Sequence, residues 1–97
     1  MVTKSLLVKL VPKPGKETAV EEILKGGASL VSQEPFTKTW YALKFADGSY
    51  GIFDSFEGDE GRDAHLNGKV ADALMANAAE LFSVAPQIDK VEVIAVK

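Results

Sequence analysis

The chain has 97 residues, the length of one domain (1–97), and 46% of them are hydrophobic, as in a folded globular protein. Its net charge of −3, with basic residues scattered along the sequence, gives no electrostatic signature of nucleic-acid binding. The absence of cysteine excludes disulfides, thiolate chemistry, iron–sulfur clusters and cysteine-ligated zinc.

The first third of the chain predicts a strand followed by a helix. The run Leu6–Val11 is rich in branched apolar residues and ends at Pro12, as a strand would. A helix is expected from about Gly15 to Val31, because apolar residues recur there at helical spacing. Gly26-Gly27 weakens that helix by about 1 kcal/mol per glycine, which would let the helix end there and resume as a short turn.

A hairpin of two aromatic strands is predicted next, after a loop marked by Glu34-Pro35. Thr37–Ala46 and Ser49–Phe56 are rich in β-branched and aromatic residues, which favour strands. Asp47-Gly48 between them predicts a two-residue turn in which both central residues adopt positive φ.

The last third predicts one helix and one strand. Asp59, in the loop Glu57–Glu60, is a candidate N-cap for a helix over about Glu60–Phe82. Pro86 ends the helical region, and Val91–Val96 is the expected final strand. The order β-α-β-β-α-β predicts an α+β fold of the ferredoxin-like, or split βαβ, type: an antiparallel four-stranded sheet with both helices on one face.

Both faces of the expected sheet carry apolar side chains. Leu6 and Val8 point to one face and Leu7 to the other, and Trp40 opposes Tyr41 in the same way. A half-solvated antiparallel sheet should instead alternate apolar and polar residues. Because two helices cover only one face, we expect a second copy of the chain to cover the other, in a two-fold homodimer.

The chain shows no sign of export or membrane insertion. Its first residues lack the apolar core and cleavage site of a signal peptide. No apolar run reaches the ~20 residues of a membrane span. We therefore expect a cytoplasmic protein without a membrane or nucleic-acid partner.

Two polar side chains are candidate catalytic residues. His65, the only histidine, titrates near neutrality, and it would take a proton from a phenol or enol or hydrogen-bond a carbonyl. The alternative is a histidine at the border of the helix, bonded to nearby backbone. Asp54 lies between Phe53 and Phe56, where a carboxylate is costly unless it is paired. It is expected to pair with Arg62, to cap the next helix, or to act as a base.

Four aromatic side chains are candidate ligand contacts. Trp40 and Phe36 would stack on a planar ligand, and Tyr50 and Phe53 would form a pocket wall, core packing being the alternative for each. Neither GxGxxG nor GxxxxGK[ST] occurs, and one histidine without cysteine does not make a transition-metal site. We therefore expect no cofactor.

The segment Tyr50–Phe56, followed by Gly61-Arg62 and Ala64-His65-Leu66, resembles the central signature of the antibiotic biosynthesis monooxygenase domain. The resemblance covers nearly the whole chain in element order and implies a dimeric α/β barrel of ferredoxin-like subunits. It further implies an oxidoreductase that oxidises an aromatic, quinol- or anthrone-like substrate with O₂, without flavin or metal. His65 would be catalytic, Asp54 would orient or tune the site, and Trp40 would line the pocket.

The chain departs from two groups within that family. His65-Leu66 is followed by Asn67-Gly68-Lys69, where many quinol-oxidising members have Thr-Pro-His. The predicted first strand, within Thr3–Val11, lacks the asparagine that haem-degrading relatives pair with the helix histidine. Three alternatives therefore stay open: a cofactor-independent monooxygenase, a non-catalytic dimeric module that binds a small hydrophobic ligand, and a haem-binding or haem-degrading relative.

Overall fold

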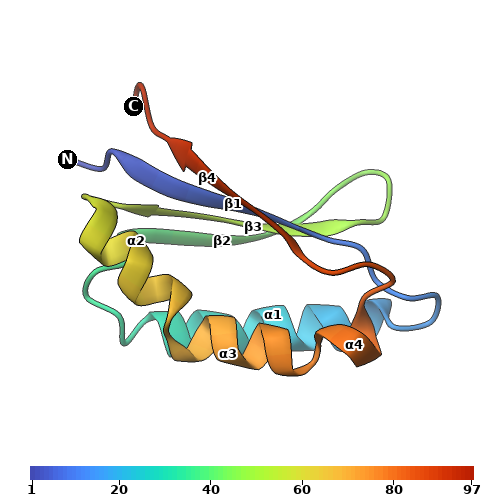
Figure 1. The fold of residues 1–97 in the computed structure, drawn as a ribbon. Coiled ribbons are helices and arrows are strands. Elements are labelled where there is room, and N and C mark those ends of the chain that lie inside the picture. Colours follow the sequence, from blue (N-terminus) through green and yellow to red (C-terminus); the bar gives the residue numbers. More distant parts are fainter.

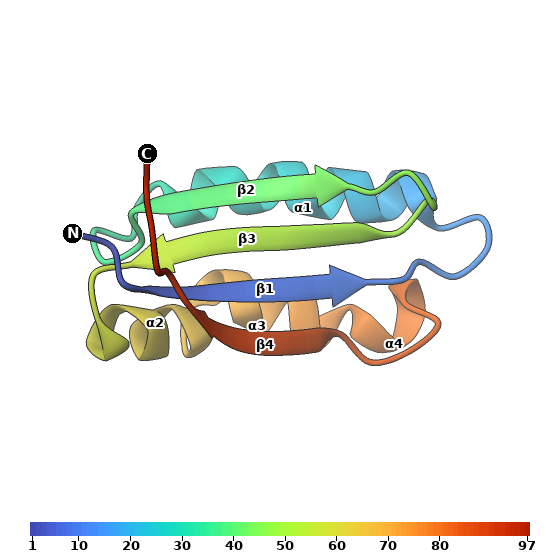
Figure 2. The same cartoon turned by 90° about the horizontal axis from the view of Figure 1, so that it is seen from above.

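The computed structural model describes all of residues 1–97 and contains one sheet with helices on one of its faces (Figure 1). The elements are β1 (Lys4–Leu10), α1 (Glu17–Val31), β2 (Thr39–Lys44), β3 (Tyr50–Phe56), α2 (Asp59–Leu66), α3 (Lys69–Ala76), α4 (Ala78–Leu81) and β4 (Gln87–Glu92). All strand pairings are antiparallel, in the order β2-β3-β1-β4 that Figure 2 shows. The predicted ferredoxin-like α+β fold is confirmed, and within this single chain the sheet is open at β2 and β4, not closed into a barrel.

Helix α1 continues through its two central glycines. Val20, Leu24 and Gly27 are its buried residues, and they face the sheet. Gly27 is buried because the ring of Trp40 lies against it: a Cβ built there would be 3.2 Å from Trp40 Cη2. The glycine pair therefore makes room for an aromatic ring and does not end the helix.

The second helical region is three helices, not the single helix predicted over 60–82. The breaks fall at Asn67-Gly68 and at Asn77. Each asparagine side chain donates to a carbonyl four residues back, Asn67 to Asp63 O at 2.9 Å and Asn77 to Ala73 O at 2.7 Å. Asparagine side chains compete in this way with the helical backbone and favour helix ends. Asp59 is also not the N-cap, because Gly58 occupies that position.

The hairpin between β2 and β3 has a three-residue loop, so the prediction of a two-residue turn is wrong. Phe45 N–H donates to Ser49 O at 2.8 Å, and Gly48 N–H donates to Phe45 O at 3.0 Å. Gly48 has φ +88°, and no residue other than glycine has positive φ. This combination is typical of a turn followed by one glycine in the left-handed region, which gives a bulge.

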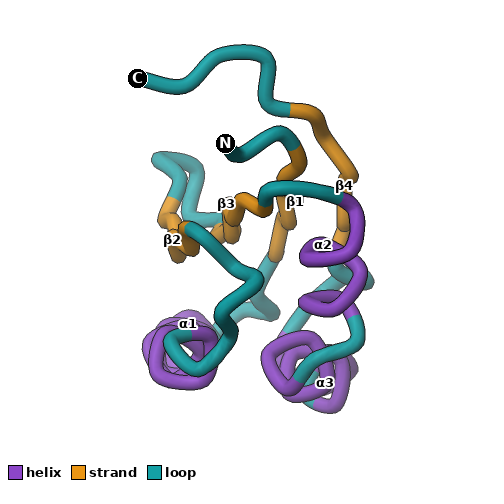
Figure 3. The backbone as a smooth tube through the Cα atoms, turned by 90° about the vertical axis from the view of Figure 1, so that its left-hand side faces the viewer, coloured by secondary structure: helices purple, strands orange, loops and turns teal.

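The last strand lies earlier than the predicted Val91–Val96. β4 pairs with β1 from Lys9↔Gln87 to Lys4↔Glu92, and β1 has no residue left to pair beyond that point. Val93 N–H still donates to Thr3 O at 2.9 Å. The chain then rises off the sheet on the side away from the helices (Figure 3), where the side chain of Ile94 is 98% exposed.

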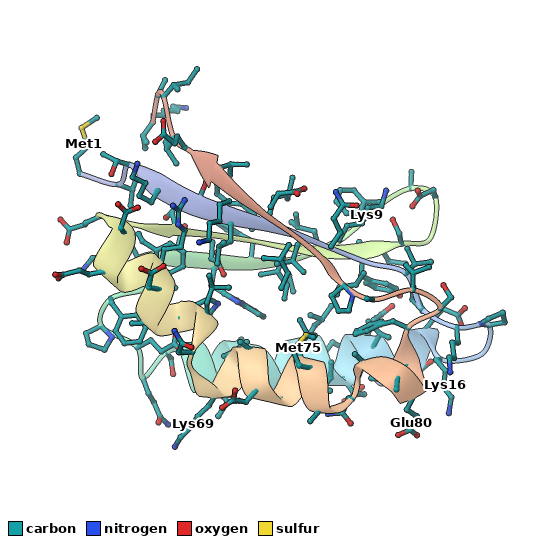
Figure 4. All side chains as sticks on the ribbon, in the orientation of Figure 1. Met1, Lys9, Lys16, Lys69, Met75 and Glu80 are labelled. Carbon is teal, nitrogen blue, oxygen red and sulfur yellow. The ribbon has the colours of Figure 1, made fainter.

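The hydrophobic core fills the space between the sheet and the helices. It is formed by Val8, Leu10, Tyr50 and Ile52 from the strands and by Val20, Leu24, Leu74, Leu81 and Phe82 from the helical layer. The outer face of the sheet is also apolar, and its Leu7, Tyr41 and Phe45 are 38%, 55% and 37% exposed. Lys9, labelled in Figure 4, projects from this outer face. No helix of the chain has the length and apolar character needed to cross a membrane.

Candidate functional site

Helix α2 holds His65 against the sheet. Arg62 and His65, three residues apart, are its two buried side chains and share its inward face. His65 is buried, and its ring centroid lies 5.4 Å from that of Phe56 on β3. The histidine thus lies inside the sheet–helix space, not at the border of the helix.

A carboxylate lies at each nitrogen of His65. Nδ1 is 2.7 Å from Glu34 Oε1, in the loop between α1 and β2, and Nε2 is 3.0 Å from Asp54 Oδ2 on β3. Thr37 Oγ1 donates to the same Glu34 oxygen at 2.7 Å. The side chains of Glu34, His65 and Asp54 are only 10%, 6% and 1% exposed. We refer to these three residues as the ionic cluster.

The cluster favours a protonated imidazole. Burial alone lowers the pKa of His65, but the contacts with Asp54 and Glu34 outweigh burial and hold the pKa above its usual value. A ring nitrogen whose lone pair faced a carboxylate at these distances would be repelled, so each contact calls for a proton between nitrogen and oxygen. An imidazolium between two carboxylates supplies both protons.

Asp54 keeps one oxygen free. Its side chain is buried, its Oδ2 makes the close but poorly aligned contact with His65, and its Oδ1 has no hydrogen-bond partner. Pairing with Arg62 was one expectation from the sequence, and the structure does not show it. Arg62 Nη2 instead lies 3.2 Å from Asp59 Oδ1, and Arg62 Nη1 donates to the carbonyl of Val91 at 3.2 Å. The unpartnered oxygen is therefore an open acceptor position within a buried site.

An apolar groove of about 280 Å³ lies between α1 and α3. Its lining includes Ile23, Leu24, Leu30, Trp40, Ile52, Val70, Ala73 and Leu74. The Trp40 Nε1 atom is buried and has no hydrogen-bond partner. A buried indole N–H normally finds an acceptor. The mostly apolar lining and this unpaired donor on a lining residue are both features of a ligand site.

A smaller void of about 30 Å³ lies next to the ionic cluster, lined by Asp54, His65 and apolar side chains that include Leu6 and Met75. Figure 4 labels Met75 on α3. The void and the groove share Ile52, Val70 and Leu74 as lining residues. Three apolar side chains therefore form a wall between the ionisable groups and the larger groove.

The other predicted contacts lie apart from this site. Tyr50 is 2% exposed in the core, and its hydroxyl donates to Glu21 at the far end of the sheet from His65. Phe53 is half-buried, between Leu7 and Tyr41 in register, on the outer face of the sheet. Phe36 lines a shallow polar hollow at the loops before β2 and α2. Of the candidate residues, the structure groups Trp40, Asp54 and His65.

Glu34 was missed as a site residue. Its only signal in the sequence was a loop position before Pro35, and the contact with His65 joins residues 31 positions apart. The ionic cluster also has a linear geometry, with the imidazole between the carboxylates. No group of three or more histidine, cysteine or carboxylate side chains in the chain is arranged to hold one metal ion, and neither ring nitrogen of His65 is free to ligate haem iron.

Comparison with known proteins found no matching protein-family model and no matching curated protein. A solved structure of a protein of unknown function from Nitrosomonas europaea is 47% identical, with a TM-score of 0.96 over 100% of this chain and 94% of that one. Two structures, from Caulobacter crescentus and Chloroflexus aurantiacus, are described as "putative antibiotic biosynthesis monooxygenase". The Caulobacter crescentus structure is 16% identical, with a TM-score of 0.84 over 97% of this chain and 92% of that one. The Chloroflexus aurantiacus structure is 20% identical, with a TM-score of 0.75 over 98% of this chain and 96% of that one.

Proposed function

Since this chain belongs to the same family as the Nitrosomonas europaea protein of unknown function and has the fold of structures described as monooxygenases, we propose that it is a cofactor-independent monooxygenase. Its substrate would be a small aromatic compound of quinol or anthrone type. The observation that carries this proposal is the buried Asp54–His65 pair, with one free carboxylate oxygen, behind the wall of an apolar groove.

The groove would hold the aromatic rings. Its apolar lining suits a flat hydrophobic molecule, and the free Nε1–H of Trp40 would donate to a carbonyl or phenolate oxygen. Rotation of Val70 or Leu74 would join the groove to the void, because both side chains line both spaces. The acidic C–H or O–H of the substrate would then reach Asp54.

Asp54 would accept the proton of the substrate, and His65 would hold Asp54 in place. This reverses the roles expected from the sequence, because both nitrogens of His65 already face carboxylates while Asp54 Oδ1 is free. The raised pKa of His65 keeps a positive charge near the substrate anion as it forms. Fixed charge in a buried site stabilises such an anion strongly.

Oxygen would react with the anion directly. For an anthrone, loss of a proton from its CH₂ group gives a carbanion, which passes one electron to O₂. The resulting radical and superoxide combine through a C–O bond, and the peroxide takes a proton from Asp54. Loss of the second C–H proton and cleavage of the O–O bond then release water. The balance is R₂CH₂ + O₂ → R₂C=O + H₂O, with both electron pairs supplied by the substrate.

Oxygen uptake tests the proposal. Purified protein would be given anthrones and hydroquinones without added cofactor, and compared with Asp54→Asn, which keeps the shape of the side chain but accepts no proton. We expect uptake to fall at least ~100-fold, as for loss of a general base. Glu80→Gln, at an exposed helix position, is the matched control. Full turnover by a folded Asp54→Asn protein would overturn the assignment.

A second candidate function is ligand binding without chemistry. The observation in its favour is the wall of Ile52, Val70 and Leu74, which separates the groove from the ionisable groups. The groove would then bind a small hydrophobic molecule and leave it unchanged. Quenching of Trp40 fluorescence by a bound aromatic compound, with no oxygen uptake in any assay, would favour this reading.

We also propose that a second copy of the chain covers the outer face of the sheet. Leu7, Tyr41 and Phe45 leave this face apolar and exposed in one subunit. A two-fold partner with the same face would cover it without exposing a new edge. Light scattering should give twice the mass of the chain for the wild type. Tyr41→Lys should give a monomer, and a monomeric wild-type protein would contradict the proposal.

A further inference from the structure

We propose that Arg62 is the positioning residue of the ionic cluster: its guanidinium fixes helix α2 on the sheet and so holds His65 at contact distance from Asp54. Arg62 would act through His65, without touching a substrate. Its consequence for catalysis rests on the proposed function. Its effect on the position of His65 does not, and can be measured by itself.

Helix α2 is attached to the sheet by charged groups. Its two buried side chains, Arg62 and His65, are both polar, whereas its apolar residues Ala64 and Leu66 are only half-buried. Helix α3, by contrast, buries two apolar side chains. Apolar packing has no preferred direction, whereas a hydrogen bond has a preferred angle. The orientation of α2 therefore depends on the polar contacts of its two buried side chains.

The guanidinium of Arg62 connects three segments of the chain. Its Nη1 donates to the carbonyl oxygen of Ser5 on β1 at 3.4 Å and to that of Val91 on β4 at 3.2 Å. Its Nη2 lies 3.2 Å from Asp59 Oδ1, in the first turn of α2 itself. Because a planar guanidinium donates in fixed directions, these contacts define where the start of α2 lies relative to both strands.

Arg62 and His65 attach α2 to the sheet at two points. His65 contacts Asp54 on β3, while Arg62 contacts β1 and β4. The two residues are three positions apart, which corresponds to about 4.5 Å along a helix axis. A helix held at a single point can pivot about it, whereas two points fix its direction. Loss of the Arg62 contacts would therefore let α2 pivot and move the imidazole relative to Asp54.

A role in stability alone does not account for this arginine. Its Nε is buried and has no hydrogen-bond partner. A buried charge with an unpaired donor stabilises a fold little, because desolvation offsets the attraction to its partners. An unbranched apolar side chain of similar length would fill the same space without that cost, but it would lack the directional contacts that the position of His65 requires.

The pKa of His65 reports on this position. Burial alone lowers the pKa, and the contacts with Asp54 from β3 and Glu34 from the loop after α1 raise it above the usual value. The side chains from β1, α3 and β4 that line the void beside His65 are apolar. The pKa therefore stays raised only while the imidazole stays close to its two carboxylates.

The experiment is an NMR titration of His65 in protein labelled with nitrogen-15 histidine. Arg62→Met should lower the pKa of His65 towards its unfolded value of about 6.5, because the imidazole moves away from its carboxylates. Removal of a positive charge would by itself raise the pKa of His65, so the sign of the change separates positioning from charge. The matched control is Lys69→Met, which removes an exposed cation at the start of α3.

Arg62→Met is expected to fold. The carbonyl oxygen of Val91 still accepts from the hydroxyl of Ser5 at 3.3 Å, and the Asp59 side chain is exposed to water. Backbone amide protection of β1 and β4 verifies this. Arg62→Lys offers one ammonium in place of the planar guanidinium, so its His65 pKa should lie between those of the wild type and Arg62→Met. If Arg62→Met does not fold, Arg62→Lys decides by the same criterion.

The outcomes separate the two proposals. A lower pKa of His65 in folded Arg62→Met, without such a fall in Lys69→Met, supports the positioning role even if no variant consumes oxygen, in which case the proposed function alone fails. A pKa equal to or above the wild-type value in Arg62→Met, or an equal fall in Lys69→Met, overturns the positioning role. Where the wild type turns over, Arg62→Met should lower kcat about tenfold or more and change KM less, because Arg62 does not line the groove.

Discussion

The groove and the ionic cluster are two contrasting regions on the same face of the sheet. The groove between α1 and α3 is mostly apolar, and it is lined by Trp40, whose buried Nε1 has no hydrogen-bond partner. The ionic cluster is almost fully buried and holds three ionisable groups in a row. Ile52, Val70 and Leu74 separate the two regions. Ligand affinity would depend on the residues of the groove and proton chemistry on those of the ionic cluster, so the two properties should respond to different mutations.

The largest effect is expected in the ionic cluster. His65→Ala leaves Glu34 and Asp54 as buried carboxylates without a cation, and breaking such a pair costs about 3 kcal/mol or more. Urea unfolding should show a corresponding fall in the free energy of unfolding. A loss below about 1 kcal/mol, as for an exposed ion pair, would mean that the cluster is not desolvated in solution.

The pH dependence of stability follows from the same contacts. Although burial alone lowers the pKa of His65, Asp54 and Glu34 raise it above the unfolded value, so the native state binds this proton more tightly. The stabilisation is fully present below the unfolded pKa of about 6.5 and is lost as the pH rises through the folded pKa. Urea midpoints should therefore fall above about pH 6.5 in the wild type, relative to His65→Gln. A difference in urea midpoint between the two proteins that did not change with pH would contradict a raised pKa of His65 in the folded state.

Substitutions at Gly26 and Gly27 should have different effects on helix stability and on ligand binding in the groove. A Cβ at Gly27 would lie 3.2 and 3.3 Å from two ring atoms of Trp40, whereas a Cβ at Gly26 would meet nothing within 4 Å. Gly26→Ala should therefore stabilise the helix by about 1 kcal/mol. Gly27→Ala should gain little, because the ring must move, and should weaken the binding of aromatic ligands followed by Trp40 fluorescence. Equal stabilisation by both changes would show that the ring is not held against Gly27.

The smallest effect is expected at the surface, outside both regions. Lys4 Nζ and Glu92 Oε1 are 2.6 Å apart, but the Glu92 side chain is 70% exposed. Glu92→Gln should change the free energy of unfolding only slightly, and less at high salt, because solvent and ions screen an exposed pair. Comparison with His65→Ala at equal ionic strength measures how much burial adds to an ion pair. If Glu92→Gln lowered the free energy of unfolding as much as His65→Ala does, solvent exposure would not determine the strength of these ion pairs.

The order of the elements could be predicted from local patterns, and their ends could not. Runs of branched apolar and aromatic residues predicted four strands in the observed order, and the helical spacing of apolar residues predicted α1. The end of β4 depends on where β1 begins, at Lys4, which is a property of the pairing. The breaks at Asn67 and Asn77 depend on side-chain hydrogen bonds that apolar spacing does not record.

The site was predictable only in part, for the same reason. Asp54 was conspicuous as a carboxylate in an apolar strand, and His65 as the only histidine. Their contact with Glu34 arises from the packing of a loop against a helix end, and no local pattern predicts it. Tyr50 and Phe53 are three positions apart on one strand, so their side chains point to opposite faces of the sheet. The first lies in the core and the second on the outer face.

The contact between Thr3 and Val93 brings the two ends of the chain together, and Figures 1 and 2 show both termini at the same end of the sheet. A short flexible peptide would therefore connect the last residue to the first without disturbing the strands. New ends opened in the loop Ala46–Gly48 would give a circular permutant with all four strands intact. A molecule of this design would show whether the order of the elements in the gene matters for folding, or only their arrangement in space.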